Sequence, residues 1–281
     1  MSNISATDVK KLRDETDAPM MECKAALVEA NGDMDRAKQI LRETGKSAAA
    51  KRAGRSTSEG IAQFVASADG KTAVGVVVES ETDFVAKNES FKALVAKLAN
   101  GMLAAGAAGP DVVVDGEPVS ALIEQAIAVI RENIVLKKAV FLTAKEGVIA
   151  VYNHHDAKKA SAVEVSGSAS NLKDAGFQVA IQTVAFPPSF LKKEDVPADV
   201  IENEIKIETE RAINEGKPAE IAAKAAQGRV NKEYFQSQVL LEQMMYTDQK
   251  KSVSTYLAEE GKVGGGPISV LQFVRLEVGT E

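Results

Sequence analysis

Apolar positions in residues 1–45 recur at helical spacing in short stretches that polar or glycine residues separate. Asp17 and Asp33 stand where N-caps would begin the second and third helices, and Gly45 stands where the third would end. The residues expected on the inner faces are Val9, Leu12, Met20, Cys23, Leu27, Ala37, Ile40 and Leu41. The pattern predicts three short helices. So small a bundle buries little apolar surface, so its exposed apolar side is a candidate docking face.

Residues 46–57 lose this periodicity and are rich in small and basic residues instead. The positive charges are those of Lys46, Lys51, Arg52 and Arg55, and alanine, glycine and serine fill most of the space between them. This composition favours a basic, flexible linker that lies in solvent.

From residue 58 onward, runs typical of strands alternate with amphipathic helical patterns. The predicted strands are 60–66, 72–79, 139–144, 147–152, 162–165 and 268–278. Helices are predicted at 88–103 and about 118–133. Another, with positions 177, 180, 181 and 184 facing inward, ends before Phe186-Pro187-Pro188. Because two strands followed by a helix occur twice, the sequence predicts an α+β fold with two similar subdomains, at 58–145 and 146–281.

Two long helical patterns occupy about residues 197–241, inside the second subdomain, and meet at Gly216-Lys217-Pro218. Glycine is common just after the end of a helix, and proline is common in the first turn of the next. A short connection of this kind turns the chain back on itself. We therefore expect an inserted antiparallel helical hairpin.

Composition and charge exclude several classes of protein. Of the 281 residues, 34 are basic and 40 acidic, which gives a net charge of −6; residues 1–55 carry +2 and the rest −8. An acidic chain is a poor match for phosphate backbones, so we expect no direct nucleic-acid partner. No apolar run reaches the ~18–20 residues of a membrane span. The N-terminus lacks a secretory pattern, and the single Cys23 fits a reducing compartment, so the sequence predicts a cytoplasmic protein.

Candidate reactive groups are few. His154 and His155 are neighbours, and adjacent histidines point to different sides of a regular backbone, so they chelate a metal poorly. The glycines at 264–266 lack the Lys-Ser/Thr that completes a phosphate loop. With no acid, base and nucleophile set either, the sequence predicts no metal, no cofactor and no enzymatic activity.

The most informative segment is residues 81–91, between a predicted strand and a predicted helix. Asn88 is expected to cap that helix, whose apolar face is Phe91, Leu94, Val95 and Leu98. Asp83-Phe84 therefore places a carboxylate beside a large apolar ring in a connection. Two interpretations are open: Phe84 is a recognition residue on a rigid scaffold, or it packs beneath the sheet as part of the core.

These residues resemble a known family. The stretch Thr82-Asp83-Phe84-Val85-Ala86-Lys87 is similar to the signature of bacterial elongation factor Ts. Further similar segments are 12–16, 20–27, 31–33, 190–196, 216–218 and 273–279. They occur in the family's order and span nearly the whole chain.

The resemblance implies a ubiquitin-associated-like docking domain at 1–45, a protruding coiled coil at about 197–241, and elongation factor Tu as the partner. It implies that Thr82, Asp83, Phe84 and Val85 form the segment that dislodges Mg²⁺ from that GTPase and promotes GDP release. It also implies partner contacts for Leu12, Arg13, Met20 and Met21.

Gln182 stands where better-known relatives carry a histidine that presses on the GTPase near its phosphate loop. On the predicted helix it points away from the inward stripe. We therefore expect it to be partly exposed, on the same face as residues 82–85.

An alternative from another class is a ubiquitin-associated-type adaptor that binds proteins or peptides through residues 1–45 and has no exchange activity. Such an adaptor would not need the segment 82–85. An α+β enzyme is a third possibility, but the sequence lacks a catalytic set.

Overall fold

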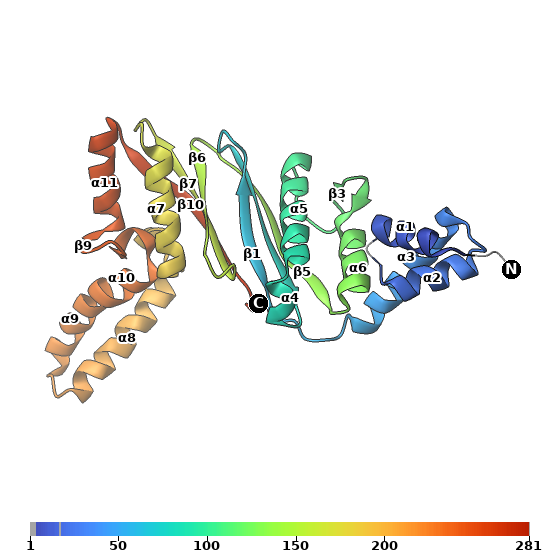
Figure 1. The fold of residues 1–281 in the computed structure, drawn as a ribbon. Helices are drawn as coiled ribbons and strands as arrows, with labels where there is room; N and C mark the ends of the chain where they lie inside the picture. The colour runs from blue at the N-terminus through green and yellow to red at the C-terminus, as the bar shows by residue number, and fades with distance from the viewer. Residues whose placement is uncertain (1–3, 17, 281) are drawn as a thin grey trace.

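The computed structural model describes residues 4–16 and 18–280 and shows an elongated molecule with a helical module at one end (Figure 1). This N-terminal module consists of α1 (Ala6–Thr16), α2 (Met20–Glu29) and α3 (Met34–Arg52). Its core contains Val9, Leu12, Ala18, Cys23, Ala26, Leu27, Ala30, Ala37 and Ile40. Asp33 caps α3 by accepting a hydrogen bond from the Arg36 amide at 2.9 Å, as predicted. The predicted cap Asp17 lies outside the described residues.

Helix α3 does not end at Gly45, so this part of the predicted linker is wrong. Residues 46–52 continue the helix, because the run Ser47-Ala48-Ala49-Ala50 contains strong helix formers. Gly45 is buried where α3 passes α6, and a Cβ there would come within 3.2 Å of the Ala128 Cβ. Ala49 is buried in the cluster beneath α6. The segment is therefore a helix that packs against the rest of the chain through Ala49, while Lys46, Ser47, Ala50 and Lys51 are exposed.

Two antiparallel sheets form the centre of the molecule and pack face to face (Figure 1). In the first, the order is β1 (Glu59–Ala66), β2 (Thr72–Ser80) and β5 (Ile134–Thr143). In the second, it is β10 (Ile268–Glu277), β7 (Lys159–Gly167) and β6 (Val148–Asn153). Buried residues between the sheets are Ala62, Phe64, Ala73, Val77, Ile149, Ala160, Ala162 and Leu276. Gly75 belongs to this interface, because a Cβ there would clash with Phe64 and Leu276.

Helices cover the two outer faces, which completes the predicted α+β fold. Helices α5 (Glu89–Ala105) and α6 (Val119–Ile130) cover the first sheet, with a small hairpin of β3 (Val113–Val114) and β4 (Glu117–Pro118) between them. Helices α7 (Leu172–Ala185) and α11 (Val253–Gly264) cover the second. Strand β5 begins five residues before its predicted start. The prediction began too late because Lys137 and Lys138, which are exposed, interrupt an otherwise apolar run.

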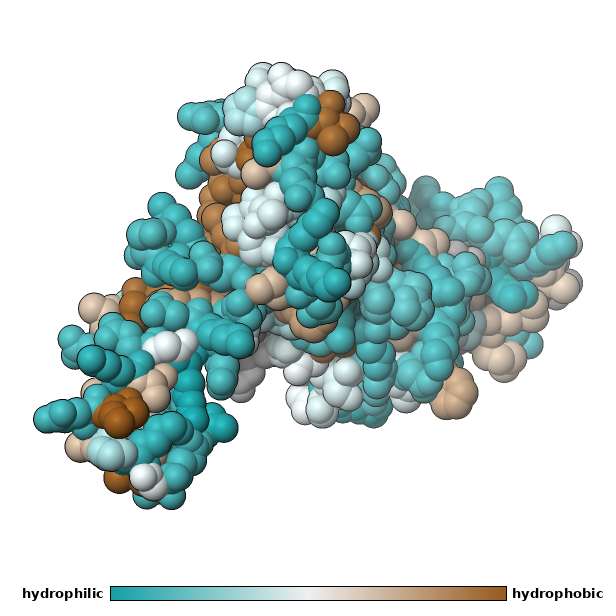
Figure 2. All heavy atoms as spheres, turned by 90° about the vertical axis from the view of Figure 1, so that its left-hand side faces the viewer, coloured by the Kyte–Doolittle hydropathy of each residue, from teal (hydrophilic) through white to brown (hydrophobic). Residues whose placement is uncertain are grey.

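The predicted hairpin projects from the second half as α8 (Ala198–Asn214) and α9 (Ala219–Arg229). A π-helical turn (Val230–Tyr234) and α10 (Phe235–Gln238) lead back to the core. Turns of 3-10 helix at Lys193–Asp195 and Leu240–Glu242, and strands β8 (Met244–Met245) and β9 (Asp248–Ser252), complete its base. Strands β8 and β9 and helix α11 were not predicted. Figure 2 faces this side, where most of the surface is hydrophilic and the apolar residues lie in separate patches.

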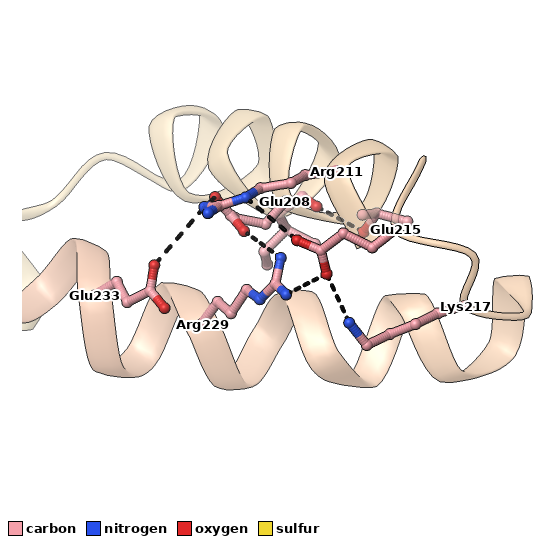
Figure 3. A network of polar contacts seen from close by, with 8 residues as sticks. Glu208, Arg211, Glu215, Lys217, Arg229 and Glu233 are labelled. Carbon is pink, nitrogen blue, oxygen red and sulfur yellow. Dashed lines mark hydrogen bonds and ion pairs between the residues drawn. The ribbon is translucent and has the colours of Figure 1, made fainter. Parts of the chain in front are cut away.

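Ion pairs join the two hairpin helices (Figure 3). Arg229 of α9 binds Glu208 of α8 at 3.2 Å and Glu215 at 2.5 Å, and Lys217 binds Glu215 at 2.7 Å. Arg229 and Lys217 lower the pKa of Glu215 to about 2. Arg229 and Glu208 are half-buried, whereas Glu215 at the end of the network is exposed, where an ion pair contributes little to stability.

A candidate partner-binding site at helix α4

Residues 83–86 form a single helical turn, α4 (Asp83–Ala86), directly after β2. Thr82 is its N-cap, and the Thr82 hydroxyl oxygen accepts a hydrogen bond from the Val85 amide at 3.4 Å. Val85 is half-buried against the cluster that contains Phe91 and Val95. With Val85 facing inward, the neighbouring Phe84 faces outward.

Phe84 has 83% of its surface exposed, the largest exposed fraction among the large apolar side chains of the described residues. The interpretation that Phe84 packs beneath the sheet is therefore wrong. A ring of this size is normally buried, and exposed aromatic rings are common at the centres of protein interfaces. The helix that follows forms as predicted: Asn88 caps α5, and Phe91, Val95 and Leu98 are buried.

Glu132, in the connection between α6 and β5, holds the start of α4. Its Oε1 accepts a hydrogen bond from the Thr82 hydroxyl at 2.6 Å, and its Oε2 accepts one from the Thr82 amide at 3.0 Å. Hydrogen bonds to a carboxylate are stronger than those between neutral groups. Sequence reasoning missed Glu132, because it is 50 residues from Thr82 and lies in no recognisable motif.

Charged residues stand close to Phe84 in the sequence of the turn. Lys87 binds Asp83 at 2.6 Å, which lowers the pKa of that carboxyl from its ordinary value of 3.8. Lys158, from the turn between β6 and β7, binds Glu59 at 2.7 Å. The pKa of Lys158 is raised, chiefly by Glu59 and to a smaller extent by Asp156 and Asp83. At neutral pH, Asp83 is a carboxylate beside Phe84.

The N-terminal module presents a second exposed apolar surface. On α2, Met20 is 50% exposed, Met21 74% and Val28 57%, so Met20 does not face inward as predicted. Arg13 of α1 is exposed as well. Leu12 is fully buried at the centre of the bundle, so the predicted partner contact for Leu12 is wrong.

Gln182 is fully buried, which overturns the expectation that it is exposed beside residues 82–85. Its Nε2 donates hydrogen bonds to the Gln243 Oε1 at 3.0 Å and the Met244 carbonyl at 3.1 Å, and its Oε1 accepts one from the Tyr246 amide at 2.7 Å. Gln243 is 2% exposed and donates to the Phe186 and Ser237 carbonyls. Gln182 therefore ties α7 to the base of the hairpin.

The predicted orientation of α7 fails for a physical reason. The prediction assumed one buried face, but α7 packs against the second sheet on one side and the segment around β8 on the other. As a result, buried positions run almost around the helix: Ala175, Gly176, Val179, Ala180, Gln182, Thr183 and Val184. Phe177, predicted to face inward, is 39% exposed and contacts the Tyr152 ring at 5.7 Å between centroids.

The described residues contain no cluster of three or more His, Cys, Asp or Glu placed to hold a metal ion. His154 instead shares a hydrogen bond of 2.9 Å with the Tyr152 hydroxyl. Cys23 is buried, and burial raises the pKa of its thiol. Within the described part of the chain, every helix is too short or too polar to cross a bilayer.

Comparisons with known proteins identify the family of this chain. The family model described as Elongation factor TS matches residues 81–280. An Elongation factor Ts from Kocuria rhizophila is 38% identical over 99% of this chain and 100% of its own length. The same name is given to relatives from Nitratiruptor sp., 40% identical over 98% of this chain, and Brucella anthropi, 39% identical over 99%; 93% of each relative is covered. This chain therefore belongs to the elongation factor Ts family and has a role in translation elongation.

Proposed function

We propose that this protein binds elongation factor Tu carrying GDP and promotes release of the GDP by disturbing the Mg²⁺ and phosphate site of the GTPase. The observation that carries the proposal is the ring of Phe84, 83% exposed on a capped turn that Glu132 holds in place. Membership of the family supports a role in elongation, and Thr82, Asp83, Phe84 and Val85 lie within the residues 81–280 that match the family model.

The exposed ring supplies the driving force. Burying Phe84 in an apolar pocket of the GTPase is favourable by roughly 1.5–3 kcal/mol. A GTPase holds GDP largely through phosphate and Mg²⁺ contacts, and Mg²⁺ demands near-ideal octahedral geometry. A small displacement of the elements around the ion therefore weakens nucleotide binding. The Asp83 carboxylate adds a negative charge near an anionic site, while Thr82 and Val85 keep the turn in shape.

Exchange follows from reciprocal coupling. If this protein binds the nucleotide-free GTPase more tightly than the GDP form, GDP must bind the complex more weakly by the same factor. A factor of ~100 requires about 2.7 kcal/mol of differential contact. The burial of one Phe ring supplies free energy of this order.

The N-terminal module would provide affinity. Met20 and Met21 on α2, with Arg13 on α1, form an exposed surface that suits docking on the GTPase. In this proposal the protein acts by binding alone, without catalytic groups or a cofactor of its own. Neither nucleic acid nor membrane contributes to the interaction, and the site of action is the cytoplasm, where translation occurs.

The test is the release of fluorescent GDP from purified elongation factor Tu, chased with excess unlabelled GDP. The release rate should rise with the concentration of this protein and saturate. An adaptor without exchange activity would bind the GTPase in a parallel titration and leave the rate of GDP release unchanged. That pair of results would overturn the proposal.

A further inference from the structure

The connection between α6 and β5, residues Arg131, Glu132 and Asn133, lies against the residues that lead into α4. Figure 1 places α4 at the same end of the first sheet as the chain that leaves α3. A one-turn helix is marginal by itself, since nucleation fixes several residues for few hydrogen bonds. The orientation of α4, and hence of Phe84, must therefore depend on what holds its ends.

Glu132 controls the cap of α4. Its two carboxylate oxygens accept the Thr82 amide and hydroxyl protons, at 3.0 and 2.6 Å. Because the hydroxyl proton points to Glu132, a lone pair of the same oxygen is left to accept the Val85 amide, at 3.4 Å. Linked hydrogen bonds of this kind polarise one another. The carboxylate thus fixes both the backbone before α4 and its capping geometry.

The connection is itself held from both sides. Asn133 is 3% exposed; its amide donates to Glu81 at 2.6 Å and its side chain to the Arg55 carbonyl at 2.8 Å. Arg131 has a left-handed φ of 67° that ends α6, and it donates to Glu22 of α2 at 2.6 Å. Glu132 therefore stands between a segment fixed to the N-terminal module and the turn that carries Phe84.

We infer that Glu132 is a positioning residue: it holds α4 so that Phe84 reaches the partner in the orientation needed to displace nucleotide. This inference rests on the proposed function and deepens it. Glu132 acts through Thr82, so its loss should leave the docking surface on α2 intact. The defect should then fall on the release rate at saturation and not on the concentration needed for half-saturation.

The experiment compares the wild type with Glu132→Ala in the fluorescent GDP assay and in hydrogen exchange. Loss of a charge-assisted pair of hydrogen bonds should lower the saturating release rate about tenfold. Half-saturation should stay within about twofold, because uniform binding is retained. The amides of Ala86, Lys87 and Asn88, which close the turn onto Thr82, Asp83 and Val85, should exchange faster. The matched control is Glu146→Ala, an exposed glutamate in the turn between β5 and β6, which should behave as wild type.

A second pair of variants separates positioning from loss of fold. Thr82→Ser keeps the hydroxyl and should lower the rate less than Thr82→Val, which removes it. Adding Glu132→Ala to Thr82→Val should cost less than in the wild type, because the hydroxyl hydrogen bond is already lost and only the bond from the Thr82 amide is left to remove. If Glu132→Ala does not fold, the two Thr82 variants still show whether the hydrogen bond to Glu132 positions α4.

Two outcomes would overturn the inference while the proposed function stands. One is unchanged amide protection in α4 of Glu132→Ala; the other is a loosened turn with a wild-type saturating rate. If instead the wild type does not accelerate GDP release, the proposed function fails. The inference that Glu132 presents Phe84 to this GTPase then fails with it. Faster hydrogen exchange of the α4 amides in Glu132→Ala would still show that Glu132 holds the turn.

Discussion

Helix α4 and the C-terminal half of α7 place apolar and polar side chains in opposite ways. At α4, the apolar ring of Phe84 is exposed, although most Phe side chains in a protein are buried. At α7, the polar Gln182 is buried, and three hydrogen bonds within the chain account for it. Contacts inside the protein explain why Gln182 is buried, whereas the Phe84 ring stays free to contact a partner. A buried polar residue whose hydrogen bonds are all made within the chain stabilises the fold. An exposed aromatic residue that the chain does not bury is a candidate for binding a partner.

The comparison changes the picture of how the nucleotide would be released. The resemblance implied two contacts near the nucleotide, at residues 82–85 and at Gln182. With Gln182 buried, the first is left as the exposed candidate. Phe186, the C-cap residue that follows α7, is 47% exposed and marks where the chain leaves this helix for the hairpin.

The largest expected effect is on stability, from Gln182→Leu. The substitution leaves the Tyr246 amide and the Gln243 side chain without their partner in a buried site. Each buried group left unsatisfied costs about 1–3 kcal/mol, so the free energy of unfolding should fall by about 2–4 kcal/mol. Urea unfolding measures it, with Gln227→Leu, an exposed glutamine of α9, as the matched control. A loss of unfolding free energy smaller than that of the control would show that the hydrogen bonds of Gln182 are dispensable.

The substitution Gln182→His tests in a second way whether position 182 is buried. If the site were exposed, Gln182→His would raise exchange or leave it unchanged. Because the site is buried and its three hydrogen bonds need one acceptor and two donors in a fixed geometry, the substitution should destabilise the protein instead. Exchange assays at a temperature where the variant is folded should show no gain.

The next effect is on exchange, from Phe84→Ala. Removing the ring removes roughly 1.5–3 kcal/mol of burial with the partner, so GDP release should slow by about tenfold or more. The thermal midpoint should stay close to wild type, since 83% of the side chain is already exposed. Phe177→Ala, which removes another exposed ring, serves as the matched control. A large drop in the thermal midpoint of Phe84→Ala would mean that the ring stabilises the fold after all.

The contrast between the two helices also shows what sequence patterns can predict. The strand before α4, the Asn88 cap and the buried face of α5 follow local rules, and the structure confirms them. For α7, the one-face pattern failed because β8, β9 and α11 were not predicted and supply its second packing surface. Glu132 and the contact between Gly45 and α6 depend on residues far apart in sequence, which periodicity does not encode.

A smaller effect is expected at the docking surface. Replacing Met20 and Met21 together with serine removes exposed apolar area from α2 without touching the buried core of the module. The concentration for half-maximal exchange should rise several-fold, and the saturating rate should stay unchanged. Val113→Ser, at an exposed valine of β3, is the control. These substitutions are preferable to deleting residues 1–55, because Ala49 of α3 is packed in the cluster beneath α6.

The smallest effect is expected from the charge pair beside Phe84. The pKa of Asp83 is lowered by Lys87, so the pair stabilises α4 above pH ~3.8 and its contribution is lost as the pH falls further. In Lys87→Met, the Asp83 carboxyl should titrate closer to its ordinary value, which NMR can follow. Asp83 stays ionised at pH 7 with or without Lys87, and exposed pairs contribute little, so the rate of GDP release at pH 7 should hardly change. A marked fall in that rate would mean that Lys87 itself contacts the partner, and the surface around α4 that binds the GTPase would then be charged as well as aromatic.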